Sequence, residues 1–239
     1  MIGIFSKTTD SSFIEAAGLS GLDFVIIDQE HGLASRETIL HHSRAAKMGG
    51  LKAIVRVSEL NHNLIGSALD QGADGVQIPN ITTADQAKQA IEAARFFPLG
   101  MRGVCRFVPA ADHGTKDKNV YFSDENQKLV ILQVEGIEGI RNIDSILALE
   151  GFDILFIGPY DLSQSLGIPG EIEHPLLLKT ISDLVEKAKK YNKLIGTFVD
   201  KKSAINHMQE QGIDYIAYSV DVNIFHEACK TIRETYDNE

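Results

Sequence analysis

The sequence has little of the material from which secreted or membrane-spanning proteins are built. Its two cysteines, Cys105 and Cys229, lie far apart and form neither a disulfide framework nor a metal-ligand spacing, which is typical of a reducing compartment. No apolar run reaches the roughly 18 residues of a membrane span, and residues 1–7 lack the charged and apolar segments of a signal peptide. We therefore expect a cytoplasmic chain without a membrane partner.

Basic residues are also scarce. The chain has 23 Lys and Arg against 33 Asp and Glu, which gives a net charge of −10. A surface that binds a phosphate backbone depends on clustered Lys and Arg, and the sequence contains no long basic run. We therefore expect no nucleic-acid partner.

The length of 239 residues is usual for a single α/β barrel and large for two separate domains. Hydrophobic residues make up 44% of the chain, enough for a core without disulfides or structural metal. No linker divides the sequence, so we predict one domain over residues 1–239. The longest stretch without a strand or helix pattern is about 98–126, and loops of this length are often functional.

Short, nearly continuous apolar runs alternate with helical patterns along the whole chain. Such runs are typical of parallel strands buried on both faces, since a solvated antiparallel sheet would show polar alternation. Eight strand–helix units in this length favour a closed (β/α)8 barrel, although a doubly wound open sheet fits the same alternation. The runs are Ile2–Phe5, Phe24–Ile27, Ala53–Val57, Gly75–Ile78, Val130–Val134, Ile154–Ile157, Leu194–Val199 and Tyr215–Tyr218.

Helix boundaries can be predicted between several of these runs. Ser35 precedes a helical pattern that ends near Gly50, and Thr83 with Gln86 forms a capping-box pattern before the next one. Pro175 follows His174 at the first turn of a further helix, which is a position that proline favours.

Polar residues gather where the apolar runs end. In an α/β barrel the active site lies at the carboxyl ends of the strands, so these residues are candidates for a common site. They are Asp28, Gln29, Glu30 and His31 after the second run, Arg56 in the third, Gln133 and Glu135 at the fifth, Gly158 to Ser163 after the sixth, and Asp221 after the eighth.

Two of these carboxylates suit a divalent cation. Gln133 and Glu135 are two residues apart on a strand and point to the same face, where a carboxylate is costly unless it is paired or bound to metal. Glu135 and Asp161, completed by water and substrate oxygens, would suit Mg²⁺, Mn²⁺ or Co²⁺ better than zinc. The alternatives are a salt bridge between Glu135 and Arg56, and Asp161 as a helix N-cap.

A histidine and the distribution of lysines indicate the kind of chemistry. His31 at a strand end could act as a general base, with a structural histidine as the alternative. We expect His41, His42 and His226 to lie on helix surfaces. An imine-forming lysine must be desolvated, and the nearest lysine to a strand end, Lys7, lies two residues past its run. The sequence therefore favours a metal over imine chemistry.

Six segments of the sequence follow one another in the order seen in one known family. They are Ile27-Asp28-Gln29-Glu30-His31, Val55-Arg56, Arg102-Gly103-Val104, Leu132-Gln133-Val134-Glu135, Gly158-Pro159-Tyr160-Asp161-Leu162-Ser163 and Val220-Asp221. Taken together, they resemble the class II pyruvate aldolases of the HpcH/HpaI aldolase/citrate lyase family. The similarity extends from Gly3 to about Ala228, and the combination of a glutamate on the fifth strand with Gly-Pro-x-Asp-Leu is specific.

The resemblance implies a fold and a role for each matching residue. The fold would be a (β/α)8 barrel of the phosphoenolpyruvate/pyruvate-binding type. Glu135 and Asp161 would be the metal ligands, and Gln133 with the Gly158-Pro159-Tyr160-Asp161 turn would bind the substrate. Arg56 would hold the oxygen that becomes the enolate. His31 would be the base, acting through a water on the hydroxyl of the aldol.

The resemblance also implies an assembly. Members of the family exchange a C-terminal helix and usually form homohexamers. Asp70 matches an aspartate that a neighbouring subunit contributes to the catalytic histidine. Within its own barrel Asp70 should lie at the far end of a helix, about a barrel height from His31. The alternative is a solvated aspartate in the last turn of that helix.

Two departures from the family pattern affect the aldehyde half of the site. Cys105 follows Arg102-Gly103-Val104 where the family often has a small residue, and the loop at 106–114 differs. Ser219 stands where the family often has glycine. We expect Arg102, Arg106, Tyr160 and Tyr218 to lie near the mouth and to favour polyhydroxylated or carboxylated aldehydes over alkyl ones.

These observations predict an enzyme that cleaves and forms 4-hydroxy-2-oxo acids from small-molecule partners, pyruvate and an aldehyde. Oxaloacetate decarboxylation would use the same metal and enolate without a base, so His31 favours the aldolase. A reaction on an acyl-CoA is disfavoured because the chain has no obvious basic patch. A catalytically silent barrel that serves as a scaffold is disfavoured by the complete set of polar strand ends.

Overall fold

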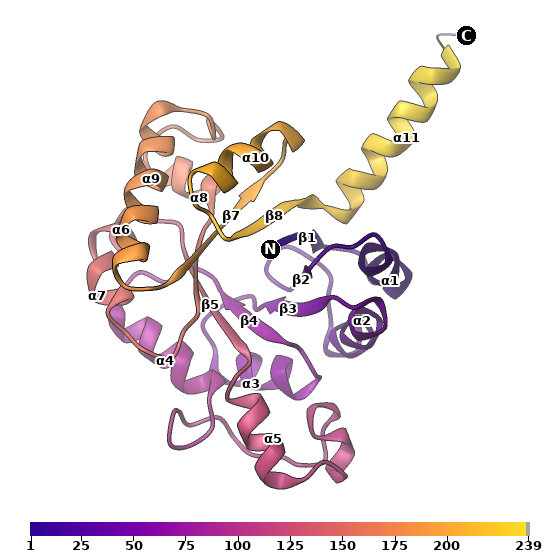
Figure 1. Ribbon diagram of the computed structural model, residues 1–239, viewed down its shortest axis with the longest axis vertical. Coiled ribbons are helices and arrows are strands. Elements are labelled where there is room, and N and C mark those ends of the chain that lie inside the picture. The colour runs from indigo at the N-terminus through magenta and orange to yellow at the C-terminus, as the bar shows by residue number, and fades with distance from the viewer. Residues whose placement is uncertain (238–239) are drawn as a thin grey trace.

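The computed structural model describes residues 1–237 and contains a closed barrel of eight parallel strands in sequence order. Helices surround the barrel (Figure 1). All eight predicted runs are strands, so the predicted (β/α)8 fold is confirmed. The strands are β1 Ile2–Ser6, β2 Phe24–Asp28, β3 Lys52–Arg56, β4 Gly75–Ile78, β5 Leu129–Val134, β6 Ile154–Ile157, β7 Leu194–Val199 and β8 Tyr215–Val220.

The helices begin and end close to the predicted signals. Ser35 caps one helix and Gly50, at φ +78°, ends it in the left-handed conformation that glycine adopts readily. Thr83 accepts a hydrogen bond from Gln86 N, but the Gln86 side chain accepts from Thr82 rather than closing the capping box. The helices are α1 Ser11–Leu19, α2 Arg36–Gly49, α3 His62–Asp70, α4 Ala84–Ala94, η1 Pro109–Gly114, α5 Lys118–Glu125, α6 Ile137–Arg141, α7 Ile143–Leu147, α8 Pro159–Ser165, α9 Pro175–Lys190, α10 Lys202–Glu210 and α11 Asp221–Asp237.

Alternate residues of each strand build two separate apolar layers. Phe24 and Ile26 face the barrel interior, whereas Val25 and Ile27 belong to the larger cluster between the strands and the helices. Inside the barrel the ring of Phe24 stacks on that of Tyr215, with 3.8 Å between ring centroids. The filled interior leaves the carboxyl ends of the strands as the place where a substrate can enter.

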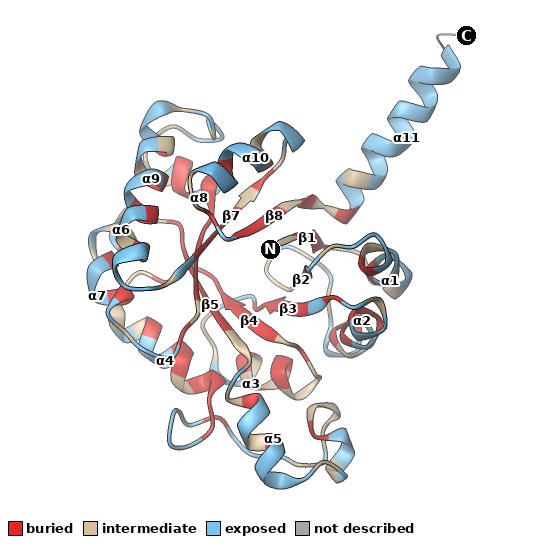
Figure 2. Cartoon of the chain, viewed as in Figure 1, coloured by how far each residue is buried: buried red, intermediate tan, exposed pale blue. Residues whose placement is uncertain are grey.

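Two segments depart from the simple barrel. The stretch predicted to be irregular, about 98–126, is partly helical, because it contains η1 and α5. Helix α11 projects away from the barrel, and all of its described residues after Ile224 are exposed (Figures 1 and 2). No helix within residues 1–237 combines the length and apolar character needed to cross a membrane.

Candidate active site

The carboxyl ends of the strands enclose a cavity of about 340 Å³. All the candidate site residues except Asp70 line it, and they come from the ends of four strands, β2, β3, β5 and β6. The polar or turn residues around it are Lys7, His31, Arg56, Gln133, Glu135, Gly158, Pro159, Tyr160 and Asp161, and the apolar ones are Phe5, Phe156, Phe198 and Val220.

The guanidinium of Arg56 is held in a fixed position at the end of β3. Its Nε and Nη2 donate to the two oxygens of Asp28 at 2.9 and 2.8 Å, and Nη1 lies 2.9 Å from Glu30 Oε2. The predicted alternative, a salt bridge between Arg56 and Glu135, is therefore wrong. Because an arginine has five N–H donors, this pairing leaves others free to meet an oxygen in the cavity. Burial alone would raise the pKa of Asp28, but Arg56, the backbone N–H of His31 and the charge of Lys7 outweigh it and lower that pKa.

A row of hydrogen bonds inside the barrel orients Glu135. Gln77 Nε2 donates to Gln133 Oε1 at 2.5 Å, and Gln133 Nε2 donates to Glu135 Oε2 at 2.5 Å. The backbone N–H of Asn80 donates to the other oxygen of Glu135 at 3.0 Å, from a residue at φ +57°. Gln133, expected to bind substrate, lines the cavity, but its amide is engaged with these neighbours. The amide of Gln133 therefore orients the carboxylate of Glu135.

The residues at β5 and β6 fit a hard divalent cation. Burial raises the pKa of Glu135 to about 7, and the charges of Asp161 and Glu30 act in the same direction. Asp161 is exposed in the first turn of α8 and makes no hydrogen bond among residues 1–237, so its carboxylate is available. The N-cap is Gly158, so the alternative role of Asp161 as N-cap is wrong. Oxygen-only donors of this kind suit Mg²⁺ or Mn²⁺.

Gly158 is required by the close approach of this turn to Glu135. A Cβ built on Gly158 would lie 2.4 Å from Glu135 Oε2. Any side chain there would displace the carboxylate. No group of three or more His, Cys, Asp or Glu within residues 1–237 could hold a metal, so two protein carboxylates would have to be completed by substrate or water oxygens.

His31 stands at the rim of the cavity. Its side chain is 58% exposed, and Nε2 lies 4.0 Å from Glu30 Oε2. The backbone N–H of His31 donates to buried Asp28, which fixes the chain but not the ring. The ring therefore faces the cavity without a close orienting partner among residues 1–237.

The four residues expected at the mouth are distributed over three places. Tyr160 lines the cavity, with its hydroxyl donating to Asp200 Oδ2 at 2.7 Å. Tyr218 packs on the outer apolar layer, and Arg102 is buried against Glu125. The Arg106 side chain binds backbone carbonyls of its own loop. The expectation that Arg102, Arg106 and Tyr218 line the mouth of their own barrel is wrong. Arg102 and Arg106 are held on the loop between α4 and η1, and Tyr218 points to the helix side of β8.

Asp70 lies at the opposite end of the barrel, as the direction of α3 requires. Its Oδ1 accepts from Arg102 Nη2 at 2.6 Å, and its side chain is 24% exposed, so the alternative of a purely solvated aspartate is wrong. The next residues, Gln71 and Gly72, line a cavity of about 1020 Å³ together with Lys52, at the start of β3. The structure therefore does not bring Asp70 to the cavity of its own chain.

The loop after β1 is fastened from two sides. Buried Asp221 accepts hydrogen bonds from Ser6 Oγ, from the backbone N–H groups of Lys7 and Thr8, and from Thr8 Oγ1. His42 Nε2 lies 3.1 Å from the carbonyl oxygen of Thr8, and this contact requires Nε2 to carry a proton.

His42 is fully buried, so its predicted surface position is wrong. Its Nδ1 lies 2.8 Å from Ser11 Oγ, which can donate to it, so the neutral ring is fully satisfied. Burial lowers the pKa of His42, outweighing the hydrogen bond to Thr8 and the charges of Asp221 and Asp10. A helical pattern alone did not show that this face of α2 meets the β1 loop.

This lowered pKa predicts an acid-sensitive contribution to stability. Below pH of about 6.5 the unfolded chain binds a proton at this position before the folded chain does, so the free energy of unfolding falls as the pH falls. His42→Gln should be less stable than wild type at pH 7.5 but should lose less stability on acidification to pH 5. Melting temperatures across this range measure the difference, with His41→Gln as the exposed control. Parallel curves for wild type and His42→Gln would contradict the prediction.

The two departures from the family pattern have different structural settings. Ser219 has φ +52°, in the left-handed region that glycine adopts without cost, and its Oγ accepts from Asn223. A glycine at this position of the family thus has a conformational reason. Cys105 is exposed on the loop before η1, and its carbonyl accepts from Tyr121 Oη.

The protein is thus a (β/α)8 barrel with carboxylates, an arginine and a histidine around one cavity at the carboxyl ends of its strands. The model of the HpcH/HpaI aldolase/citrate lyase family matches residues 1–228, and the chain belongs to this family. The chain is 34% identical to 2-keto-3-deoxy-L-rhamnonate aldolase of Salmonella gallinarum (strain 287/91 / NCTC 13346) over 228 residues, 95% of this chain and 85% of that protein.

Solved structures agree with this family. A HpcH/HpaI family protein from Burkholderia cenocepacia J2315 has a TM-score of 0.94 at 30% identity, covering 99% of this chain and 94% of that one. The citrate synthase SbnG has a TM-score of 0.89 at 28% identity, covering 99% and 93%. With named aldolases among its relatives, the chain is a carbon–carbon lyase.

Proposed function

We propose that this enzyme is a class II pyruvate aldolase that cleaves 4-hydroxy-2-oxo acids to pyruvate and an aldehyde, and catalyses the reverse addition. The observation that supports this most strongly is the single cavity in which Glu135 and Asp161 face Arg56 and His31. The named aldolase relatives support the same reaction class.

The side chains of the cavity divide the reaction between them. In the cleavage direction His31 accepts the proton of the C4 hydroxyl through a water, the C3–C4 bond breaks, and the aldehyde leaves. The bonding electrons move toward the 2-oxo oxygen, where the fixed charge of Arg56 stabilises the developing enolate. Protonation at C3 then gives pyruvate. In oxaloacetate decarboxylation, the alternative reaction, the step assigned to His31 would be absent.

Glu135 and Asp161 would hold a divalent cation, Mg²⁺, Mn²⁺ or Co²⁺. When bound, such an ion supplies Lewis-acid polarisation of the carboxylate and 2-oxo oxygens of pyruvate. Gln133 and the Asn80 N–H keep the carboxylate of Glu135 directed at this position, at 2.5 and 3.0 Å. Gly158 keeps the turn close enough for Asp161 to reach the same place.

The first test is removal of metal. Chelation with EDTA should abolish pyruvate release from 4-hydroxy-2-oxo acids, and added Mg²⁺, Mn²⁺ or Co²⁺ should restore it, because no lysine or arginine among residues 1–237 forms an ion pair with Glu135 in place of the ion. Lys7 lines the cavity but is partly exposed and 3.5 Å from Asp28, which does not give the desolvation that imine formation needs. Borohydride with pyruvate should therefore trap no adduct. A trapped lysine adduct, or full activity in EDTA, would overturn the metal-dependent reading.

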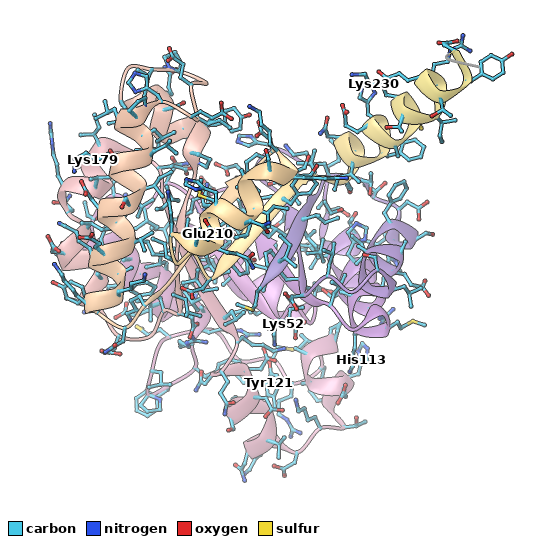
Figure 3. The ribbon with its side chains drawn as sticks, turned by 45° about the horizontal axis from the view of Figure 1, so that its top comes forward. Lys52, His113, Tyr121, Lys179, Glu210 and Lys230 are labelled. Carbon is cyan, nitrogen blue, oxygen red and sulfur yellow. The ribbon has the colours of Figure 1, made fainter. Side chains whose placement is uncertain are left out.

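We propose further that the active site is completed by an assembly of identical chains, up to a hexamer. Among residues 1–237, helix α11 contacts the barrel near its beginning, where the ring of Phe225 lies 6.1 Å from that of Phe13 in α1, and Figure 3 shows Lys230 on the projecting part. Phe225, Ile232 and Tyr236 are 57%, 69% and 71% exposed on it, an apolar surface that an exchanged helix would bury. Asp70, remote from its own His31, would meet the His31 of a neighbouring subunit.

Complementation tests the shared site. Arg56→Ala and Asp70→Asn should each be weakly active alone, about 100-fold below wild type or lower. Co-refolded mixtures should regain activity, because some sites then take Arg56 from one chain and Asp70 from the next. Mixed oligomers verified by mass spectrometry that stay as inactive as their parents would remove Asp70 from the catalytic residues. Thermal denaturation of Asp70→Asn controls for the loss of its ion pair with Arg102.

A further inference from the structure

Lys7 enters the active-site cavity although it lies outside the apolar run of its strand. It is two residues after Phe5, whose ring faces the barrel interior, and both residues line the cavity. The side chain of Lys7 is 30% exposed, so it is neither buried in the protein nor free in solvent. Apart from Arg56, it is the only lysine or arginine around this cavity within residues 1–237.

The backbone of Lys7 is held firmly. Its N–H donates to both oxygens of buried Asp221, at 3.0 and 3.1 Å, and the next residue is held by Asp221 and His42. A lysine on a flexible loop would lose conformational entropy on binding a ligand, whereas this one has only its side chain to order. The loop therefore presents the ammonium to the cavity in a prepared position.

The charge of Lys7 acts on Asp28 and Glu30, but its ammonium hydrogens are not used by either carboxylate. Its Nζ lies 3.5 Å from Asp28 Oδ2, and it makes no hydrogen bond among residues 1–237. Asp28 already accepts from Arg56 on both oxygens and from the backbone N–H groups of Glu30 and His31 on one of them. An ammonium group has three donors, so those of Lys7 remain available to a molecule in the cavity.

The position of Lys7 in the barrel indicates which part of the substrate it meets. In the closed order of eight strands, β1 lies opposite β5, which carries Glu135, and beside β2, which leads to His31. The pyruvate half would occupy the side of Glu135, Asp161 and Arg56. The aldehyde half would then extend from His31 toward β1 and β8. The other residues there are the apolar Phe5, Phe198 and Val220, and Tyr160, whose hydroxyl already donates to Asp200. Lys7 is therefore the group that can bind an anion.

We propose that Lys7 is a specificity-determining residue that binds a carboxylate on the aldehyde half of the substrate. This inference rests on the proposed aldolase function. Lys7 gives this enzyme a preference for acidic aldehydes over neutral ones of the same length, because its Nζ donates a charge-assisted hydrogen bond to the carboxylate. The proposed reaction assigns the free donors of Arg56 to the enolate oxygen, and Asp28 and Glu30 hold its guanidinium in place, so Lys7 is the cation left for this carboxylate.

Matched pairs of acceptors test the proposal. Aldol addition of pyruvate would be measured with glyoxylate and 4-oxobutanoate and with their neutral methyl esters. For each pair, the measured quantity is kcat/KM for the acid divided by kcat/KM for its ester. For the acid that wild type uses better, this ratio should fall about 30-fold in Lys7→Met, which is the effect of one charge-assisted hydrogen bond. Lys7→Arg should retain most of the ratio, and the distant surface variant Lys88→Met should leave it unchanged. An unaltered ratio in Lys7→Met with both pairs would overturn the proposal.

A second measurement separates this proposal from the aldolase reaction itself. Exchange of the pyruvate methyl protons into D₂O, followed by NMR, reports the pyruvate half without any aldehyde. Suppose that the wild-type enzyme exchanges these protons and adds pyruvate to aldehydes, but Lys7→Met leaves the acid-over-ester ratio of kcat/KM unchanged. This result contradicts only the role of Lys7. Wild-type enzyme that does neither contradicts the aldolase function and removes the role of Lys7 with it.

Discussion

Glu135→Gln is expected to abolish both aldol cleavage and the exchange of pyruvate methyl protons, by at least about 1000-fold. The amide keeps the size of the side chain but removes the negative charge that would bind a cation opposite Asp161. It also places an N–H where Glu135 accepts from Gln133 or Asn80, so the orientation of the group is lost with its charge. Steady-state kinetics and a titration with Mn²⁺, followed by electron paramagnetic resonance, measure both consequences.

Glu138→Gln is the matched control for this variant. Glu138 lies three residues further along, is exposed, and does not line the cavity. It should bind Mn²⁺ and turn over like wild type. Retention of Mn²⁺ binding and of more than a tenth of the activity in Glu135→Gln would show that another group holds the metal.

His31→Ala is expected to separate the two halves of the reaction. Aldol cleavage should fall about 100- to 10,000-fold, the usual contribution of a general base. Exchange of the pyruvate methyl protons should fall much less, because Arg56 and the carboxylates that would stabilise the enolate stay in place. Parallel measurements of pyruvate release and of deuterium incorporation give the two rates.

The exposed histidine His62, at the start of α3, supplies the control variant His62→Ala, which should leave both rates unchanged. If His31→Ala lowers cleavage and exchange by the same factor, the histidine is not specific to the aldol step. If it lowers neither, the base is another group.

The fold was predictable because buried parallel strands leave a simple pattern. Each strand is apolar on both faces, so all eight appear as short runs between helix signals such as Ser35 and Gly50. The grouping of strand-end residues was predictable for the same reason. Parallel strands place all their carboxyl ends at one end of the barrel, so Arg56, Glu135 and Asp161 meet without any knowledge of side-chain conformation.

Contacts that depend on loop paths and rotamers were not predictable. Nothing in the sequence shows that Arg56 pairs with Asp28 of the adjacent strand β2 rather than with Glu135 across the barrel mouth, because the choice depends on the rotamer of the arginine. The place of Gln77 inside the barrel could have been predicted, because it is a polar residue within an apolar run. Lys7 carried a signal as well, since it lies at the same parity as Phe5, but its direction depends on the loop that Asp221 and His42 hold.

The placement of Arg102 shows a different limit. A motif places a residue on a loop but not at a particular end of the barrel, and the excursion from 98 to 126 carries Arg102 to Asp70 and Glu125. If Arg102 contributes to the mouth of an active-site cavity, that cavity belongs to another subunit. Sequence arguments made for one chain cannot assign such residues.

Asp221 also has a consequence for synthesis. This one carboxylate, at the beginning of the last helix, fastens the loop that follows the first strand. Domains fold as the ribosome releases them, from the amino end onward. A nascent chain that has not yet exposed residue 221 can have its β2 to β7 strands in place while the Lys7 loop still lacks its anchor. The Lys7 loop therefore gains its anchor only after β8 has been made, together with the closure of the barrel.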